Sequence, residues 1–330
     1  MIFSIALILA FTLAVFGLNV GEALQTMFGS AFGSKYALAR TSARAVPLIL
    51  CGLGLTIAWK AAVYNIGGEG QYIFGGISAA AIYLVVQKMP PILGIFLILV
   101  GSMAGGGVLA WFAGWLQVKR GVQVVISTIL LNFIALKFLE MLVYGPLQES
   151  KKQIPQSERI SDAFVLWHPD PGMDFHAGVF IAILAAVLLF AWLMYTRSGF
   201  NLRFVGESPT AARANKISVD KVQLQAMAIS GALCGLAGGV TYLGLSRQIG
   251  LGFGQGWGFM GIPVALIGGL NPLGALVSGS FFGALFAGSE GLARSTPIGN
   301  TVVYVVQAAA VLAFVGFKAW QNRKQKEVVD

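Results

Sequence analysis

Apolar and polar residues alternate along the chain in long blocks. Ten stretches are mostly apolar, with approximate cores at residues 2–20, 46–64, 72–86, 91–118, 122–144, 179–195, 224–245, 259–270, 273–287 and 302–317. A helix needs about 20 mostly apolar residues to cross a bilayer, and shorter ones are accepted inside a bundle. The stretches at 72–86, 259–270 and 273–287 are short or interrupted by glycine. The pattern predicts an all-α polytopic membrane protein with eight to ten membrane-spanning helices, some short or broken, in a single domain over residues 1–330.

The amino-acid composition indicates that the protein lies in a lipid bilayer. The chain is 57% hydrophobic and 11% charged, whereas soluble domains carry roughly 25% charged residues. Its net charge of +9 sits mainly in loops and the C-terminal tail, where anionic lipid headgroups attract it, so membrane lipid and not nucleic acid is the expected partner. Cys51 and Cys234 lie in apolar stretches and are expected to be small buried residues without a redox or metal role.

Basic residues in short loops indicate which loops are cytoplasmic. The loop at 197–221 carries an excess of basic residues, namely Arg197, Arg203, Arg213, Lys216 and Lys221 against Glu207 and Asp220. With ten helices, Lys119, Arg120 and the basic tail fall on the same side. The loop at 146–176, rich in acidic residues, is then external, and both termini are cytoplasmic.

The cytoplasmic loop contains the start signals of a short helix. Ser208 is a good N-cap because its hydroxyl accepts from free backbone N–H groups, and Pro209 loses no hydrogen bond at the first helical position. A helix of about one and a half turns is marginal alone in water. We expect it to lie against the membrane surface or a partner protein.

A polar, glycine-rich break at residues 65–71 separates two apolar stretches that are very close in sequence. Its polar members are Asn65, Glu69 and Gln71. Such a break is either a tight cytoplasmic turn or a broken helix that lines a transport path. A carboxylate near the hydrocarbon is usually paired or faces water, and Lys60 is a candidate partner for Glu69.

Other polar residues inside apolar stretches have two interpretations. Gln123, Ser127, Thr128 and Asn132 recur at roughly helical spacing, so they form either a polar stripe along a lumen or hydrogen bonds between helices. Lys137 and Glu140 stand three residues apart and are expected to pair, and Glu290, at the end of a stretch, is expected to be exposed. Glycines four residues apart predict close helix contacts, at Gly101 and Gly105, at Gly231, Gly235 and Gly239, and at Gly279 and Gly283.

Enzyme motifs are missing from the chain. Its two histidines, His168 and His176, lie in the external loop among prolines, which favours a solvated loop that faces a partner over a metal site. There is no phosphate-binding glycine loop that ends in Lys-Ser/Thr. The chain is therefore expected to be no enzyme and to bind no metal or cofactor, and ATP hydrolysis, if it drives the protein, takes place in another chain.

Four segments together resemble a known family. They are Asn65-Ile66-Gly67-Gly68-Glu69-Gly70-Gln71, Val125-Ile126-Ser127-Thr128-Ile129-Leu130-Leu131-Asn132, residues 206–217, and residues 258–269. Across most of its length the chain is similar to permease subunits of bacterial ABC importers for simple sugars, nucleosides and branched-chain amino acids. The break at 65–71 is most like that of the nucleoside and simple-sugar permeases.

The resemblance implies a role for each polar segment. The short helix would be the coupling helix that docks on a separate ATPase subunit, which holds ATP and Mg. Glu207 and Arg213 would make polar contacts, and small residues would let the helix seat; the residues concerned are Gly206, Glu207, Ser208, Pro209, Ala211, Ala212 and Arg213. The translocation path would involve Asn65, Glu69, Gln71, Gln123, Thr128 and Asn132. A second permease subunit, identical or related, and an external substrate-binding protein at 146–176 complete the complex in the bacterial inner membrane.

Three departures from the family pattern limit the resemblance. Gln123 and Val124 stand where Asn-Glu is common, and Met260 replaces an acidic residue. Lys216 replaces a usual glycine, so Asn215 is expected to take the left-handed conformation that ends the coupling helix. A purine nucleoside is the first expected solute and a simple sugar the second.

Two further hypotheses concern the class of transporter and its symmetry. An ion-coupled secondary transporter of a small polar solute, built around Glu69 and Lys60, is the alternative function. Glycine-rich breaks after residue 46 and after residue 224, in blocks that start on opposite sides of the membrane, are what an inverted repeat produces.

Overall fold

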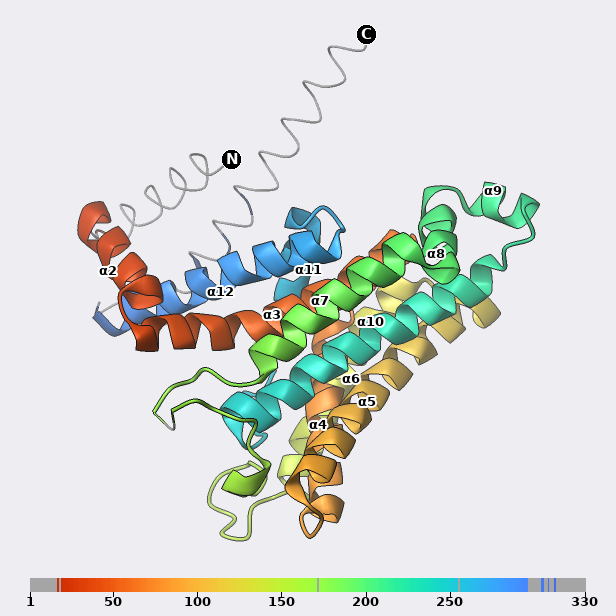
Figure 1. Ribbon diagram of the computed structural model, residues 1–330. Helices are drawn as coiled ribbons and strands as arrows, with labels where there is room; N and C mark the ends of the chain where they lie inside the picture. Colours follow the sequence, from red (N-terminus) through yellow and green to blue (C-terminus); the bar gives the residue numbers. More distant parts are fainter. Residues whose placement is uncertain are drawn as a thin grey trace. The chain divides into compact units, whose positions relative to one another are not determined.

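The computed structural model describes residues 17, 19–170, 172–254, 256–295, 304, 305, 308 and 312. Over these residues the protein contains eleven α-helices, labelled α2 to α12 in Figure 1. Their bounds are α2 (Val20–Phe32), α3 (Lys35–Lys60), α4 (Gly68–Val86), α5 (Pro91–Arg120), α6 (Val124–Val143), α7 (Gly178–Tyr195), α8 (Arg197–Glu207), α9 (Pro209–Ala214), α10 (Val219–Thr241), α11 (Trp257–Ile267) and α12 (Pro272–Ser295). A short 3₁₀ helix, η1 (Asp162–Phe164), and a π-helical turn, η2 (Tyr242–Ser246), accompany them.

Seven helices of the described part are long and apolar enough to cross a membrane, so the protein is an all-α, polytopic membrane protein. The predicted stretches at 2–20 and 302–317 lie almost wholly outside the described residues, as do the terminal segments. The count of eight to ten helices therefore stays a prediction. The stretch predicted at 72–86 starts earlier than expected, because α4 begins at Gly68 and runs for 19 residues.

The chain forms two compact units, and the first comprises residues 1–44 and 281–330. In this unit the hydroxyl of Thr41 donates to the carbonyl of Ala31 over 2.8 Å. Glu290 pairs with Arg44 at 3.1 Å and with Arg294 at 3.6 Å, and its side chain is only 23% exposed. The expectation of an exposed Glu290 is therefore wrong, because two arginines lie beside its carboxylate.

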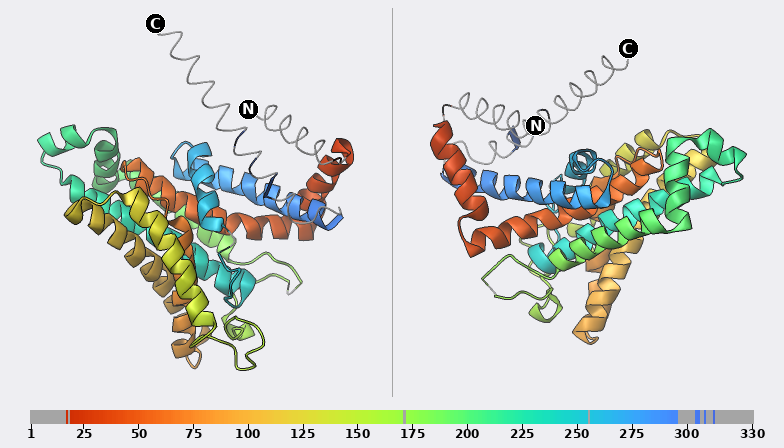
Figure 2. Two further views of the ribbon diagram at one scale, coloured as in Figure 1. Left: turned by 180° about the vertical axis from the view of Figure 1, so that it is seen from behind. Right: turned by 45° about the horizontal axis from the view of Figure 1, so that its top comes forward.

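The second unit, residues 45–280, is centred on α4, α5 and α10, which pack through glycines. A Cβ added to Gly235 of α10 would lie 2.2 Å from the carbonyl oxygen of Ser102 on α5, and one added to Gly75 of α4 would lie 2.2 Å from the carbonyl oxygen of Gly235. These backbones touch because no side chain separates them. The packing role predicted for the spaced glycines is confirmed here, and Figures 1 and 2 show α5 and α10 side by side.

Helices α5 and α10 run in opposite directions. Gly114, near the C-terminal end of α5, faces Met227 near the start of α10, whereas Ser102 faces Gly239 near its end. The basic end of α5 therefore lies at the same end of the unit as the start of α10, with α8 and α9 (Figure 1). The loop at 146–176 contacts the other end of α10, so the two loops lie at opposite ends, as the predicted topology requires.

Helix α11 does not cross a membrane. Its 11 residues span about 16 Å at 1.5 Å per residue, roughly half the hydrocarbon thickness. The chain then turns back through Gly269 and Leu270, both with positive φ, into α12. The hydroxyl of Ser278 on α12 donates to the carbonyl of Val264 over 2.7 Å, so α11 and the start of α12 form a helical hairpin.

Candidate functional site

Helix α9 has the start that was predicted for it. The hydroxyl of Ser208 accepts a hydrogen bond from the backbone N–H of Ala211 over 3.2 Å, and Pro209 occupies the first helical position. Its end differs from the prediction. Lys216, and not Asn215, takes the left-handed conformation, with φ of 62° against −86°.

The reason for this difference is a Schellman motif at the end of α9. The N–H of Ile217 donates to the carbonyl of Ala212, and the N–H of Lys216 donates to that of Arg213, both over 3.0 Å. This pattern places the left-handed residue one position after Asn215. The side-chain amide of Asn215 donates to the carbonyl of Ala211 over 2.9 Å, which requires no left-handed backbone.

One face of α9 is anchored and the other is exposed. Ala212 is fully buried against Val205 of α8 and Val219 of α10, so it is not available to a partner. The expectation that both alanines form the docking face is wrong for Ala212, although Ala211 is partly exposed. Glu207 and Arg213 are exposed, and Arg213 lies 4.0 Å from Asp220.

Gly206 joins α8 to the end of α3. A Cβ added to Gly206 would lie 1.9 Å from the carbonyl oxygen of Lys60, the last residue of α3. Only glycine allows this approach, because a backbone carbonyl cannot rotate away as a flexible side chain can. The segment made of α8 and α9 thus touches the break that follows α3. It is called the coupling segment below, after the role that the sequence resemblance leads us to expect.

The break itself is a structured connection between two helices, here called the joint (residues 61–67). A Schellman motif ends α3, with Ala62 at φ of 56° and the N–H of Val63 donating to the carbonyl of Ala58 over 3.0 Å. Helix α4 then begins at Gly68. The predicted interruption between the two helices is confirmed.

Asn65 is the centre of the joint and is completely buried. Its side-chain Nδ2 donates to Oε1 of Gln71 over 3.0 Å and to Oγ of Ser230 on α10 over 2.9 Å. Its Oδ1 accepts from the N–H of Gly67 over 2.8 Å and from Nε2 of Gln71 over 3.0 Å. The indole of Trp59 donates to the carbonyl of Asn65 over 3.0 Å. The polar groups of Asn65 are matched, which is what a buried amide requires.

Helix α6 holds the joint from another side. Oδ1 of Asn132 accepts from the N–H of Gly70 over 2.8 Å, and its Nδ2 donates to the carbonyl of Ile66 over 3.0 Å. Oγ1 of Thr128 accepts from the N–H of Ile66 over 3.3 Å. Thr128 and Asn132 thus hydrogen-bond outside α6, as one of the two interpretations expects, whereas the hydroxyl of Ser127 bonds carbonyls at the start of its own helix. Gln123 lies apart from them, exposed at the start of α6.

Glu69 binds α11 and not Lys60. Its Oε1 accepts from the N–H of Gly256 over 3.0 Å and its Oε2 from the N–H of Gly258 over 2.7 Å. The expected pair with Lys60 is therefore wrong, because backbone groups at the start of α11 satisfy the carboxylate. A Cβ added to Gly258 would lie 2.2 Å from the backbone nitrogen of Glu69, so the two chain segments are in direct contact.

Five of the residues at this site were predicted from the sequence, but several of their partners were not. Asn65, Glu69, Gln71, Thr128 and Asn132 share the joint and its immediate neighbours. The alternating glycines at 252, 254, 256 and 258 are a signal of close backbone approach that could have indicated the partner of Glu69. Nothing in the sequence indicates that Ser230 is a partner of Asn65, because a single serine in an apolar helix is common.

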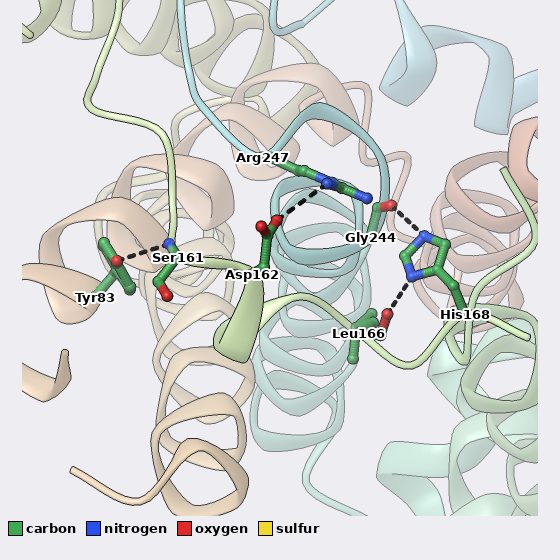
Figure 3. Close-up of polar contacts among 7 residues, drawn as sticks. All are labelled: Tyr83, Ser161, Asp162, Leu166, His168, Gly244 and Arg247. Carbon is green, nitrogen blue, oxygen red and sulfur yellow. Dashed lines mark hydrogen bonds and ion pairs between the residues drawn. The ribbon is translucent and has the colours of Figure 1, made fainter. Parts of the chain in front are cut away.

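The loop at 146–176 is packed on η2 and the residues around it, and Figure 3 shows several of the contacts. The N–H of Ser161 donates to the hydroxyl of Tyr83 over 2.9 Å, and Asp162 pairs with Arg247 at 3.3 Å. Nε2 of His168 lies 3.1 Å from the carbonyl oxygen of Gly244, and its Nδ1 contacts the carbonyl of Leu166. The expectation that this whole loop is solvated is wrong, because it hydrogen-bonds to residues 243–249.

His176 is buried in the same region, next to the start of α7, with 1% of its surface exposed. Burial, together with the nearby ring of His168, lowers the pKa of His176 to about 4. Its Nδ1 accepts from the N–H of Gly178 over 3.1 Å, which also requires that nitrogen to be unprotonated. Among the described residues no group of three or more His, Cys, Asp or Glu side chains is arranged to hold a metal ion.

Comparison with known proteins places this arrangement in a family. Residues 37–315 match the family model described as the branched-chain amino acid transport system / permease component. The chain is 31% identical to the glucose ABC transporter permease protein TsgB13 of Haloferax volcanii, covering 92% of this chain and 82% of the relative. It is also 31% identical to the guanosine permease NupP of Bacillus subtilis (92% and 88%) and to the nucleoside permease NupB of Lactococcus lactis (94% and 87%).

The chain belongs to this family of transport-system permeases. It is a permease subunit of an ABC importer and a multi-pass membrane protein, and it is not a catalytic subunit. This membership removes the ground for an ion-coupled secondary transporter, whose proposed Glu69–Lys60 centre is also not formed.

Proposed function

We propose that the chain forms half of the translocation path of an ATP-driven importer for a nucleoside, with a simple sugar as second candidate. The relatives support this range, since two are nucleoside or guanosine permeases and one is a glucose permease. A purine nucleoside is the first candidate because two of these three relatives are guanosine or nucleoside permeases.

The observation that carries the proposal is the construction of α9. This helix is too short to be stable alone, yet it is capped at Ser208, anchored through Ala212 and left exposed at Glu207 and Arg213. A fixed helix with exposed charges at one end of the unit is suited to bind a partner and to pass on a displacement. We assign it as the docking element for a separate ATPase subunit, which holds ATP and Mg.

The remaining partners follow from this assignment. A second permease subunit, identical or related, completes the path, and an external substrate-binding protein docks at the loop 146–176. The chain itself holds no cofactor, and it lies in the bacterial inner membrane with both termini in the cytoplasm. The translocation role of Asn65, Glu69, Gln71, Gln123, Thr128 and Asn132 stays a prediction, as does the inverted repeat.

Co-purification with the ATPase subunit tests the docking role. Replacing Glu207→Ala together with Arg213→Ala removes both exposed charges and leaves the buried Ala212 contact untouched, so the retained ATPase should fall about tenfold. The control is Lys137→Ala with Glu140→Ala, an exposed acid–base pair on α6 separated by 2.6 Å, which should have no effect. Unchanged co-purification of the first variant would contradict the docking role.

Uptake in proteoliposomes tests the importer itself. We expect guanosine uptake only when the ATPase subunit, a binding protein and ATP are all present. Glucose uptake under the same conditions would shift the assignment to a sugar. Uptake by the chain alone, driven by a proton or sodium gradient, would refute the ATP-driven mechanism.

A further inference from the structure

We propose that Glu69 is a positioning residue that ties α11 to the joint, so that α11 moves when the coupling segment is displaced. The first part of this inference concerns the chain alone. The second part rests on the proposed function, because it takes the ATPase subunit as the source of the displacement.

The contact between Glu69 and α11 is specific on both sides. Each carboxylate oxygen accepts one backbone N–H, from Gly256 and from Gly258. The absence of a side chain at Gly254 leaves room for the carboxylate in this position, because a Cβ there would lie 2.6 Å from its Oε1 and would force it to shift. These two hydrogen bonds join the first turn of α4 directly to the start of α11.

The joint carries this contact to the coupling segment. It is braced by Asn65, whose side chain bonds Gln71 and Ser230, and by Asn132 from α6. A segment with its internal hydrogen bonds satisfied moves as a body and does not bend, because each broken bond would leave a buried group unpaired. At its start, the carbonyl of Lys60 lies against Gly206 of α8.

Helix α11 is suited to respond to such a movement. It is short, it does not cross the membrane, and it turns back through two residues with positive φ at its far end. A pull on its N-terminal end can tilt it about that turn, against the part of α3 on which it packs through Gly52 and Gly261. The structure thus joins α9, α8, the joint, Glu69 and α11 through direct contacts.

Spin labels on α11 and α5 test the inference. The labels replace Phe259, which is 46% exposed, and Val108, which is 65% exposed, in a chain with Cys51→Ala and Cys234→Ala. In the complete transporter in nanodiscs we expect the distance between the labels to change when ATP binds. In Glu69→Gln one carboxylate oxygen becomes an N–H₂ group facing a backbone N–H, so this change should disappear and transport should fall about tenfold or more.

A matched glycine pair covers the case in which Glu69→Gln fails to fold. Gly254→Ala changes the other partner of the contact, because its added methyl group would press against Oε1 of Glu69. It should have the same effect as Glu69→Gln. Gly252→Ala, two residues earlier, enters open space and should behave as the parent protein. Both variants leave the coupling segment intact, so the ATPase subunit should still co-purify and hydrolyse ATP.

The outcomes separate this inference from the proposed function. An ATP-dependent distance change that persists in Glu69→Gln or Gly254→Ala would overturn it, as would a parent protein whose label distance ignores ATP. If the parent chain fails to retain the ATPase, the proposed function fails instead. The contact between Glu69 and α11 is then tested in the chain without the ATPase. The spin label at position 259 should become more mobile in Glu69→Gln and in Gly254→Ala. Unchanged mobility would overturn the inference.

Discussion

At the scale of single residues, buried polar side chains in this protein are matched mainly by backbone groups. Glu69 accepts two N–H groups, and Asn132 bonds one N–H and one carbonyl. Leaving such a group unpaired costs about 1–3 kcal/mol, so each partner restricts where its helix can lie. The polar residues inside the apolar segments therefore act first on the geometry of the fold.

We expect His176 to make the loop at 146–176 sensitive to pH. Its pKa of about 4 in the folded chain lies below the ordinary value of 6.5, so the unfolded loop binds more protons between these values. Stability is complete above pH 6.5 and falls as the pH is lowered toward 4, by about 2 kcal/mol at pH 4.5. Amide hydrogen exchange of Gly178 should accelerate accordingly, and His176→Gln should remove this dependence. An unchanged dependence in that variant would contradict the assignment.

At the scale of elements, the end of α9 is held in a strained conformation. Lys216 has φ of 62°, where a residue with a Cβ loses about 1 kcal/mol relative to glycine. Lys216→Gly should therefore stabilise α9 by about 1 kcal/mol, measured as slower exchange of the Ile217 amide.

Asn215 provides the matched comparison for this prediction. Its φ of −86° is ordinary, and its side chain donates to the carbonyl of Ala211. Asn215→Gly should therefore destabilise the same helix end, through the lost hydrogen bond and the added backbone freedom of glycine. Stabilisation by Asn215→Gly and not by Lys216→Gly would show that the left-handed residue has been misplaced.

Packing between α5 and α10 depends on contact between backbones. In Gly235→Ala the added methyl group would lie 2.2 Å from the carbonyl oxygen of Ser102, so the helices must separate. We expect a loss of about 2 kcal/mol or more, seen as earlier thermal unfolding in detergent. Gly29→Ala, in α2, enters open space and should be neutral or slightly stabilising. Equal effects of the two substitutions would argue against close packing at Gly235.

At the scale of the whole molecule, the sequence was sufficient for the class of fold. Apolar stretches predicted the long helices, because the bilayer sets their length, and the Ser208–Pro209 signal predicted α9, because capping is local. The sequence predicts contacts less well where a residue's partner lies far away along the chain. Glu69 and Gly258, for example, are brought together only by the packing of α4 and α11.

The same limit explains the corrected residues. Ala212 is as small as a docking residue should be, yet it is buried by Val205 and Val219, which only the fold reveals. Glu290 stands at the end of an apolar stretch, but Arg44, over two hundred residues earlier, lies beside it. Residue propensity favours Asn215 over Lys216 for the left-handed conformation at the end of α9. The hydrogen bonds of the Schellman motif place that conformation at Lys216 instead.

The position of Glu69 has an electrostatic consequence for the contact between α4 and α11. The residue lies in the first turn of α4 and bonds to the first turn of α11, so two helix N-termini converge on one carboxylate. Each terminus carries a partial charge of about +0.5 from its helix dipole, which attracts a negatively charged side chain. An acidic side chain at this position therefore favours the approach of the two helix starts, whereas a basic one would oppose it.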